Sequence, residues 1–146
     1  MKKLALLVLI IGVVLVGSAV GQEFTDVTVG SADPGGTVVA DGVYEVTGNG
    51  NDIWDNADAF QYYYTKLIGD GSIEARVVDM GEGTNNWAKG GVMIRQSLDA
   101  GSMHAITALT GGDGGGAAFQ RRIDDNGTTT SNHDLPDGPF APPYWV

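Results

Sequence analysis

The stretch Leu67–Ser97, LIGDGSIEARVVDMGEGTNNWAKGGVMIRQS, decides the fold class of this chain. It contains two runs, 72–80 and 89–96, whose side chains follow the two-residue period of a β-strand. Polar and glycine residues separate the two runs. We therefore expect an antiparallel hairpin at the centre of a β-sheet. The side chains predicted to face the core are Ile73, Ala75, Val77, Val92 and Ile94.

The same alternation recurs along the chain and predicts an all-β protein. Strands are expected over 24–29, 37–40, 43–47, 60–67, 103–110 and 117–123. Asp41-Gly42, between two of them, is a dipeptide favoured in two-residue hairpins. Phe119 is expected to point inward, and 124–143 reads as a long loop. The 23 glycines suit the turns of a many-stranded sandwich and would destabilise helices.

The amino-terminal residues have the pattern of a secretory signal peptide. Two lysines precede an apolar run, and small residues follow that run before Gln22. This pattern predicts that 1–21 is a signal peptide and that 22–146 is a secreted or extracellular domain with no membrane segment. The alternative is an uncleaved anchor, because the run 4–20 approaches the length that spans a bilayer.

Charge and cysteine content limit the possible partners. The net charge is −10, and removal of the two leader lysines would make it more negative. An acidic surface repels nucleic acid and anionic lipid, so nucleic-acid binding is not expected. The chain has no cysteine, so its stability must come from sheet packing, helped or not by a bound cation. The length suits one domain, and the sequence does not indicate an oligomeric state.

Three segments carry a resemblance to a known family: DIWDNADAF at 52–60, GDGSIEARV at 69–77 and WAKGGVMIRQSLDAGSMHA at 87–105. From about Phe24 onward the chain resembles secreted bacterial modules, sometimes labelled "regulation of enolase", with the concanavalin A-like lectin/glucanase jelly-roll fold. Those modules are related in shape to laminin-G domains. PPYWV at 142–146 resembles the start of a further strand, which more strands follow in the family. The resemblance therefore implies a jelly-roll β-sandwich that is incomplete at its carboxyl-terminal end.

A carboxylate-rich segment is the first candidate site. Asp52, Asp55 and Asp58 stand close together in sequence, with Asn51 and Asn56 beside them. Calcium takes six to eight oxygen ligands, and loops rich in Asp and Asn supply them. Family members of this shape often carry a structural calcium, so a calcium site is one interpretation. The alternative is that the carboxylates accept hydrogen bonds from turn amides or face water.

Aromatic residues are the second candidate site. Trp54, Tyr63 and Trp87 are candidates for a platform that stacks on a sugar ring, whose C–H groups favour a π-face. Tyr63 is expected to be exposed, because its neighbours on either side take the opposite face of their strand. Arg95 is a candidate to hold a ligand carboxylate, or else to pair with Glu74. The alternative for both tryptophans is a place in the core.

The sequence offers no catalytic residue. Glucanases of the resembled fold use carboxylates in a Glu-x-Asp-x-Glu strand, and retaining hydrolysis needs two carboxyl groups about 5 Å apart. Glu74 has no acidic neighbour on the same face of its strand. We therefore expect a non-catalytic binding or adhesion module for extracellular carbohydrate or a cell-surface partner. The alternatives are a partial or degenerate glycoside hydrolase of the same fold and a structural spacer domain.

Overall fold

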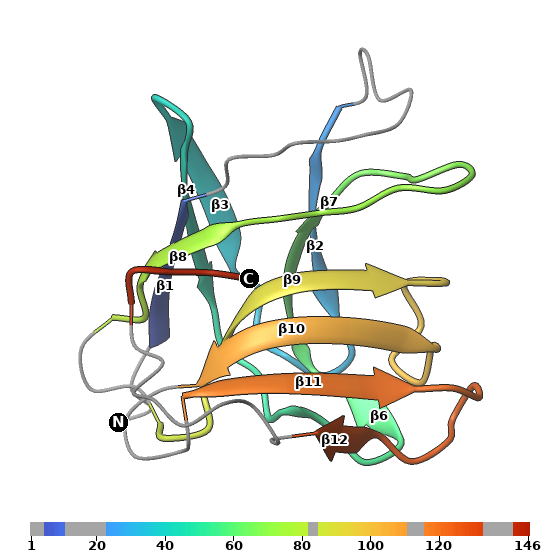
Figure 1. The fold of residues 1–146 in the computed structure, drawn as a ribbon. Helices are drawn as coiled ribbons and strands as arrows, with labels where there is room; N and C mark the ends of the chain where they lie inside the picture. The colour runs from blue at the N-terminus through green and yellow to red at the C-terminus, as the bar shows by residue number, and fades with distance from the viewer. Residues whose placement is uncertain (1–4, 11–22, 82–84, 111–115, 133–141) are drawn as a thin grey trace.

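The computed structural model describes residues 5–10, 23–81, 85–110, 116–132 and 142–146, and the regular elements in this part of the chain are β-strands (Figure 1). The prediction of an all-β protein is confirmed. No helix among these residues is long and apolar enough to cross a membrane.

The largest sheet has five antiparallel strands in the order β13-β8-β1-β4-β3. The predicted hairpin at Asp41-Gly42 is confirmed, because β3 and β4 pair directly around it. Both turn residues have positive φ, 51° and 77°, as a type I′ turn requires. The bounds of the strands are Tyr144–Trp145 (β13), Arg76–Asp79 (β8), Ala5–Ile10 (β1), Val43–Gly48 (β4) and Gly36–Ala40 (β3).

A second sheet has four antiparallel strands in the order β12-β11-β10-β9. The strands expected over 103–110 and 117–123 are confirmed as β10 and β11, which pair with each other and place His104 opposite Arg122. The segment 124–143, predicted to be a loop, contains the short strand β12, and its part from 133 to 141 lies outside the described residues. The bounds are Thr130–Asn132 (β12), Ala117–Arg122 (β11), His104–Thr110 (β10) and Lys89–Arg95 (β9).

Two ribbons complete the described structure. The first pairs β2 (Thr25–Val29) with β7 (Phe60–Tyr64) in antiparallel register. The second pairs β5 (Ile53–Trp54) with β6 (Ala57–Asp58) inside the carboxylate-rich segment. The side-chain alternation expected in β7 is confirmed, because the rings of Phe60, Tyr62 and Tyr64 follow one another in contact on one face.

The central hairpin predicted from Leu67–Ser97 is wrong in its pairing. β8 belongs to the five-stranded sheet, where its neighbours are β1 and β13, and β9 pairs with β10 in the other sheet. The connection between β8 and β9 therefore crosses from one sheet to the other. Alternation reports which side of a strand is buried but not which strand lies beside it, so it predicted both strands without predicting their partners.

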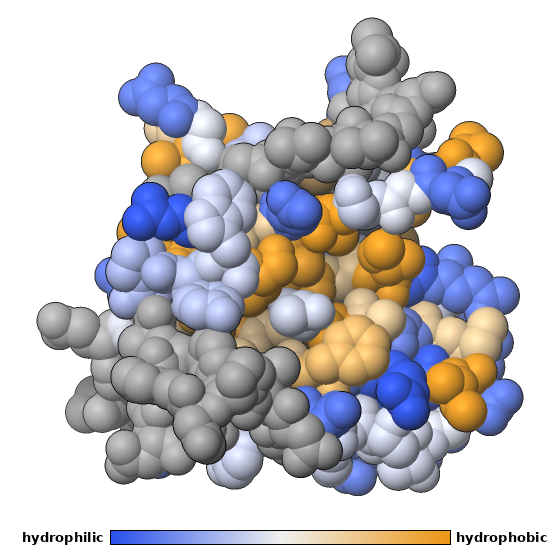
Figure 2. Space-filling model, in the orientation of Figure 1, coloured by the Kyte–Doolittle hydropathy of each residue, from blue (hydrophilic) through white to orange (hydrophobic). Residues whose placement is uncertain are grey.

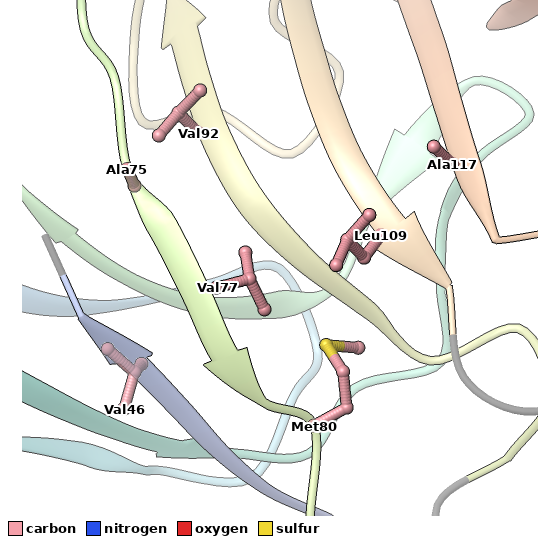
Figure 3. Packing of buried hydrophobic residues seen from close by; sticks show 7 residues of the cluster. All are labelled: Val46, Ala75, Val77, Met80, Val92, Leu109 and Ala117. Atoms are coloured by element: carbon pink, nitrogen blue, oxygen red, sulfur yellow. The ribbon is translucent and has the colours of Figure 1, made fainter. Parts of the chain in front are cut away.

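The two sheets pack face to face around one apolar cluster (Figure 3). Strands β4 and β8 contribute residues from one sheet, and β9, β10 and β11 contribute residues from the other. This packing across two layers fits a β-sandwich. The buried members are Val46, Ala75, Val77, Met80, Val92, Leu109 and Ala117. Three of the five predicted core residues of Leu67–Ser97 are among them, and Ile73 packs against the cluster while half-buried.

The other face of the four-stranded sheet is also covered. Met93 and Ile106 pack there with Ile53, and the rings of Phe60 and Tyr62 from β7 lie against them. Two residues that were predicted to point into the core are exposed instead, Ile94 by 47% and Phe119 by 36%. Both lie on the face of the four-stranded sheet that is turned towards the five-stranded sheet. Each lies two residues further along its strand than a member of the core cluster on the same face, which is Val92 for Ile94 and Ala117 for Phe119.

Candidate functional site

A hollow beside Trp87 combines an exposed aromatic ring with polar side chains. It has a volume of about 680 Å³, which is within the range of roughly 300–1,000 Å³ common for ligand pockets. Trp87, just before β9, is 56% exposed. The polar residues that line the hollow are Asn49, Asn51, Asp52, Gln61, Asn85 and Lys89, and its apolar floor includes Val46, Ile53, Met93 and Ile106. We call it the Trp87 hollow.

Hydrogen bonds fix the backbone on both sides of the Trp87 ring. The Trp87 amide donates to Asn85 Oδ1 at 2.8 Å, as in an Asx turn. The Trp87 carbonyl accepts from Lys89 Nζ at 3.4 Å. Lys89 Nζ also pairs with Asp52 Oδ1, an oxygen that accepts from the Ile53 amide at 2.7 Å as well. The indole is therefore presented from a turn whose position is held by charged and amide groups of the same hollow.

A second hollow adjoins the first and is mostly apolar. It has a volume of about 610 Å³ and shares Val46, Gln61, Tyr62, Gly91 and Met93 with the Trp87 hollow. Hydrophobic side chains gather in a depression at the centre of the face drawn in Figure 2. The side chains that line the second hollow include Phe24, Tyr63, Tyr64, Leu67, Ile73, Val92, Ile94 and Leu98.

The three aromatic residues predicted to form a platform are distributed over different places. Trp87 lines the first hollow, Tyr63 lines the second, and Trp54, 37% exposed, lines neither. Tyr63 is half-buried rather than exposed, since its ring stacks on Phe24 at 5.2 Å and contacts Tyr44 at 5.7 Å between centroids. The structure thus keeps Trp87 as a candidate for stacking and does not bring the other two rings to it.

Arg95 and Asp58 belong to a buried ionic cluster on the four-stranded sheet. Asp58 Oδ1 accepts from Arg122 Nη2 at 2.7 Å, and Oδ2 accepts from Arg122 Nη1 at 2.9 Å. Oδ2 also accepts from Arg95 Nη1 at 3.2 Å. The side chains of Asp58 and Arg122 are fully buried, and His104 Nδ1 lies 3.4 Å from Asp58 Oδ2. The carboxylate that Arg95 binds in the described structure is that of Asp58, not that of Glu74.

Arg122 connects its own strand, β11, to three other segments of the chain. Its five donors are matched by carbonyl oxygens in addition to the carboxylate of Asp58, which suits the fixed fork of a guanidinium. The accepting carbonyls belong to Trp54, Asp55, Ala100, Ser102 and Gly127. This arrangement is what a buried charge requires, because each polar atom taken from water needs a partner. Its chemical role is to hold the segments at this end of the sheet together.

Burial sets the protonation of the cluster. It lowers the pKa of His104, and the charges of Arg122 and Arg95 lower it further against the opposing effect of Asp58. The imidazole is therefore neutral at pH 7, and its approach to Asp58 is not an ion pair. Burial likewise lowers the pKa of Arg95, opposed by Asp58, but the guanidinium stays charged at any ordinary pH. Burial raises the pKa of Tyr62, whose hydroxyl donates to the Met93 carbonyl at 2.9 Å.

The carboxylates of Asp52, Asp55 and Asp58, for which a calcium site was one interpretation, do not form a cluster in the described structure. Over the described part of the chain, no three or more His, Cys, Asp or Glu side chains come together as metal ligands would. Both oxygens of Asp58 face guanidinium groups, whose positive charge would repel a cation. The Asp52 carboxylate accepts from a turn amide, as the alternative interpretation holds, and also binds Lys89.

Sequence reasoning missed Arg122 and Lys89. Arg122 lies on the face of β11 that also carries Ala118 and Gln120, both buried. The other face of β11 carries Ala117, which is buried in the core cluster, so both faces of the strand are covered and the period of two gives no reason to single out Arg122.

Comparison with known proteins identifies no relative: no family model matches the chain, nor does any curated protein or solved structure.

Proposed function

We propose that the exported chain is a non-catalytic carbohydrate-binding module, and that its site is the Trp87 hollow. The observation that carries this proposal is an indole 56% exposed above a hollow lined by amide, carboxylate and ammonium groups. A sugar ring offers C–H groups on its face and hydroxyls on its rim. The Trp87 ring can stack on the C–H groups of the face, and the polar groups of Asn51, Asp52 and Lys89 can form hydrogen bonds with the hydroxyls.

We also propose that the β-sandwich is a jelly roll. The β-sandwich described above is compatible with a jelly roll of the concanavalin A-like type, and the segments that resemble the lectin/glucanase-fold modules supply the reason to prefer it. We also infer export of residues 22–146 by the signal peptide. An extracellular location would bring the module to polysaccharides or to glycans of a cell surface.

The lining of the hollow favours binding over hydrolysis. Asp52 is the acidic side chain among the described residues that line it, and its Oδ1 is already engaged by Lys89 and the Ile53 amide. A retaining hydrolase needs two carboxyl groups about 5 Å apart, one to attack and one to donate a proton. A carboxylate paired with an ammonium group suits the acceptance of a sugar hydroxyl better than it suits acid catalysis.

A glycan array with the full chain tests the proposal. We expect binding that falls about tenfold or more in Trp87→Ala, which corresponds to about 1.4 kcal/mol, and that is retained in part by Trp87→Phe. Trp54→Ala is the matched control, because Trp54 is exposed and lines neither hollow. Binding that Trp54→Ala and Trp87→Ala reduce equally, or no binding to any glycan, would contradict the proposal.

A further inference from the structure

The strand β1 occupies an unexpected place. It lies between β4 and β8 in the five-stranded sheet (Figure 1). Its residues are in antiparallel register with β4 from Ala5 to Leu9, and with β8 from Val8 to Ile10. β4 and β8 have no pairing with each other, so β1 joins them into one sheet.

The same residues belong to the predicted signal peptide. Cleavage before Gln22 would remove β1 from the centre of the sheet. The facing edges of β4 and β8 would then be unpaired on either side of a gap one strand wide, which we call the lane. Both neighbouring strands carry core residues: Val46 on β4 and Val77 on β8. Unpaired backbone groups along such edges bind another strand readily, and apolar side chains next to them add to the driving force.

We propose that the lane between β4 and β8 is a strand-acceptor site. The leader fills it in the unprocessed chain, and an extended apolar segment of a second polypeptide fills it after cleavage. The segment seated there now, ALLVLI over Ala5–Ile10, indicates the chemistry of that partner: about six residues, apolar and without charge. Recognition would follow the β-addition mode, in which main-chain pairing gives affinity and alternate side chains give selectivity. This inference does not depend on carbohydrate binding.

A cysteine trap in the full chain tests whether the lane holds the leader. The chain has no cysteine, so two introduced thiols report on one another alone. Leu7 lies opposite Val46, and directly opposed antiparallel residues have Cα separations of about 4.5–5.5 Å, which a disulfide can bridge. The control pairs Leu7→Cys with Val39→Cys on β3, which is separated from β1 by β4. The protein is made by cell-free synthesis without membranes, so that the leader is retained.

We expect the Leu7→Cys, Val46→Cys pair to oxidise at least ten times faster than the control pair. Equal rates would overturn the proposal, because the leader would then have no fixed register. A disulfide at this pair that forms between two copies would support it, since the lane would then have accepted a strand from outside.

A second experiment supplies the donor strand in trans. The full chain carries Val8→Pro, which removes a ladder N–H from its own leader, together with Val46→Cys. The probe is a synthetic peptide of residues 2–11 with Leu7→Cys, and the matched control is the same peptide with Val8→Pro. We expect the first peptide to crosslink at least tenfold more than the control.

Equal crosslinking of the two peptides, or none, would overturn the acceptor site. Because the first experiment keeps the unaltered Val8, it decides the question of the leader even if the Val8→Pro chain does not fold.

Discussion

Replacing Asp58 with asparagine tests whether the buried ionic cluster stabilises the fold. The substitution keeps the size of the side chain and removes its charge. Two hydrogen bonds from Arg122, at 2.7 and 2.9 Å, end on the two carboxylate oxygens, and both side chains are fully buried. The new amide nitrogen would meet a guanidinium group, and both are donors. Asp58→Asn therefore leaves Arg122 buried without a counter-ion.

The expected loss is large. Removing one partner of a buried ion pair costs about 3–5 kcal/mol, because the remaining charge has lost its compensation and cannot regain water. Domains of this size have unfolding free energies of about 5–15 kcal/mol, so the loss is a substantial share of the total. With a urea m-value of about 2 kcal/mol per molar, the unfolding midpoint should fall by about 2 M.

Equilibrium urea unfolding, followed by tryptophan fluorescence and far-ultraviolet circular dichroism, measures this loss. Asp33→Asn is the matched control, because it removes the same charge at an exposed position, where the carboxylate accepts a hydrogen bond from Asn49 Nδ2 at 2.8 Å. Exposed charges contribute about 0–1 kcal/mol, so this variant should unfold near the wild-type midpoint. A loss of less than about 1 kcal/mol in Asp58→Asn, or equal losses in the two variants, would refute the reasoning about buried charge.

Three further predictions concern pH, backbone packing and calcium. Because burial lowers the pKa of His104, the unfolded chain takes up a proton that the folded chain resists. The unfolding free energy should therefore fall as the pH drops from about 7 through 6.5 towards 5.5, and His104→Gln should flatten that part of a urea-midpoint curve. Gly50→Ala should cost about 1–3 kcal/mol in the same urea assay, since its Cβ would meet the Ala59 carbonyl oxygen. Gly36→Ala, with nothing within 4 Å, should cost less than about 0.5 kcal/mol. Added calcium or chelator should leave the melting temperature unchanged, because Asp58 is engaged by arginines, and a calcium-dependent rise would contradict this account.

The sequence predicts where the strands of this protein lie better than it predicts which strands pair with each other. Local signals were sufficient at Asp41-Gly42, where the turn residues alone bring β3 and β4 together. They were sufficient again for β10 and β11, which adjoin in sequence and pair. They failed between β8 and β9, because the choice between a hairpin and a crossing to the other sheet depends on which faces find an apolar partner. That choice is made by packing over the whole molecule.

The same limit explains the outcome at the candidate sites. Trp87 could be proposed from its residue type and its polar surroundings, and the structure places it at a hollow. Arg122 could not be proposed, since its partner Asp58 lies 64 residues away in sequence. Whether a carboxylate takes an arginine or a cation depends on which side chain the fold delivers to it.

Two of the three carboxylates in the segment 52–58 show how the fold gives different roles to residues of one sequence pattern. Asp58, fully buried, is matched by two guanidinium groups and fixes the loops around Arg122. Asp52, more than a third exposed, is tied through Lys89 to the turn that presents Trp87. A buried charge must be compensated on every side and has no capacity left for a ligand, whereas a partly exposed one can exchange water for a hydroxyl at little cost. Ligand contacts should therefore be sought at the Asp52 end of this segment, although the residue types alone make the two positions equivalent.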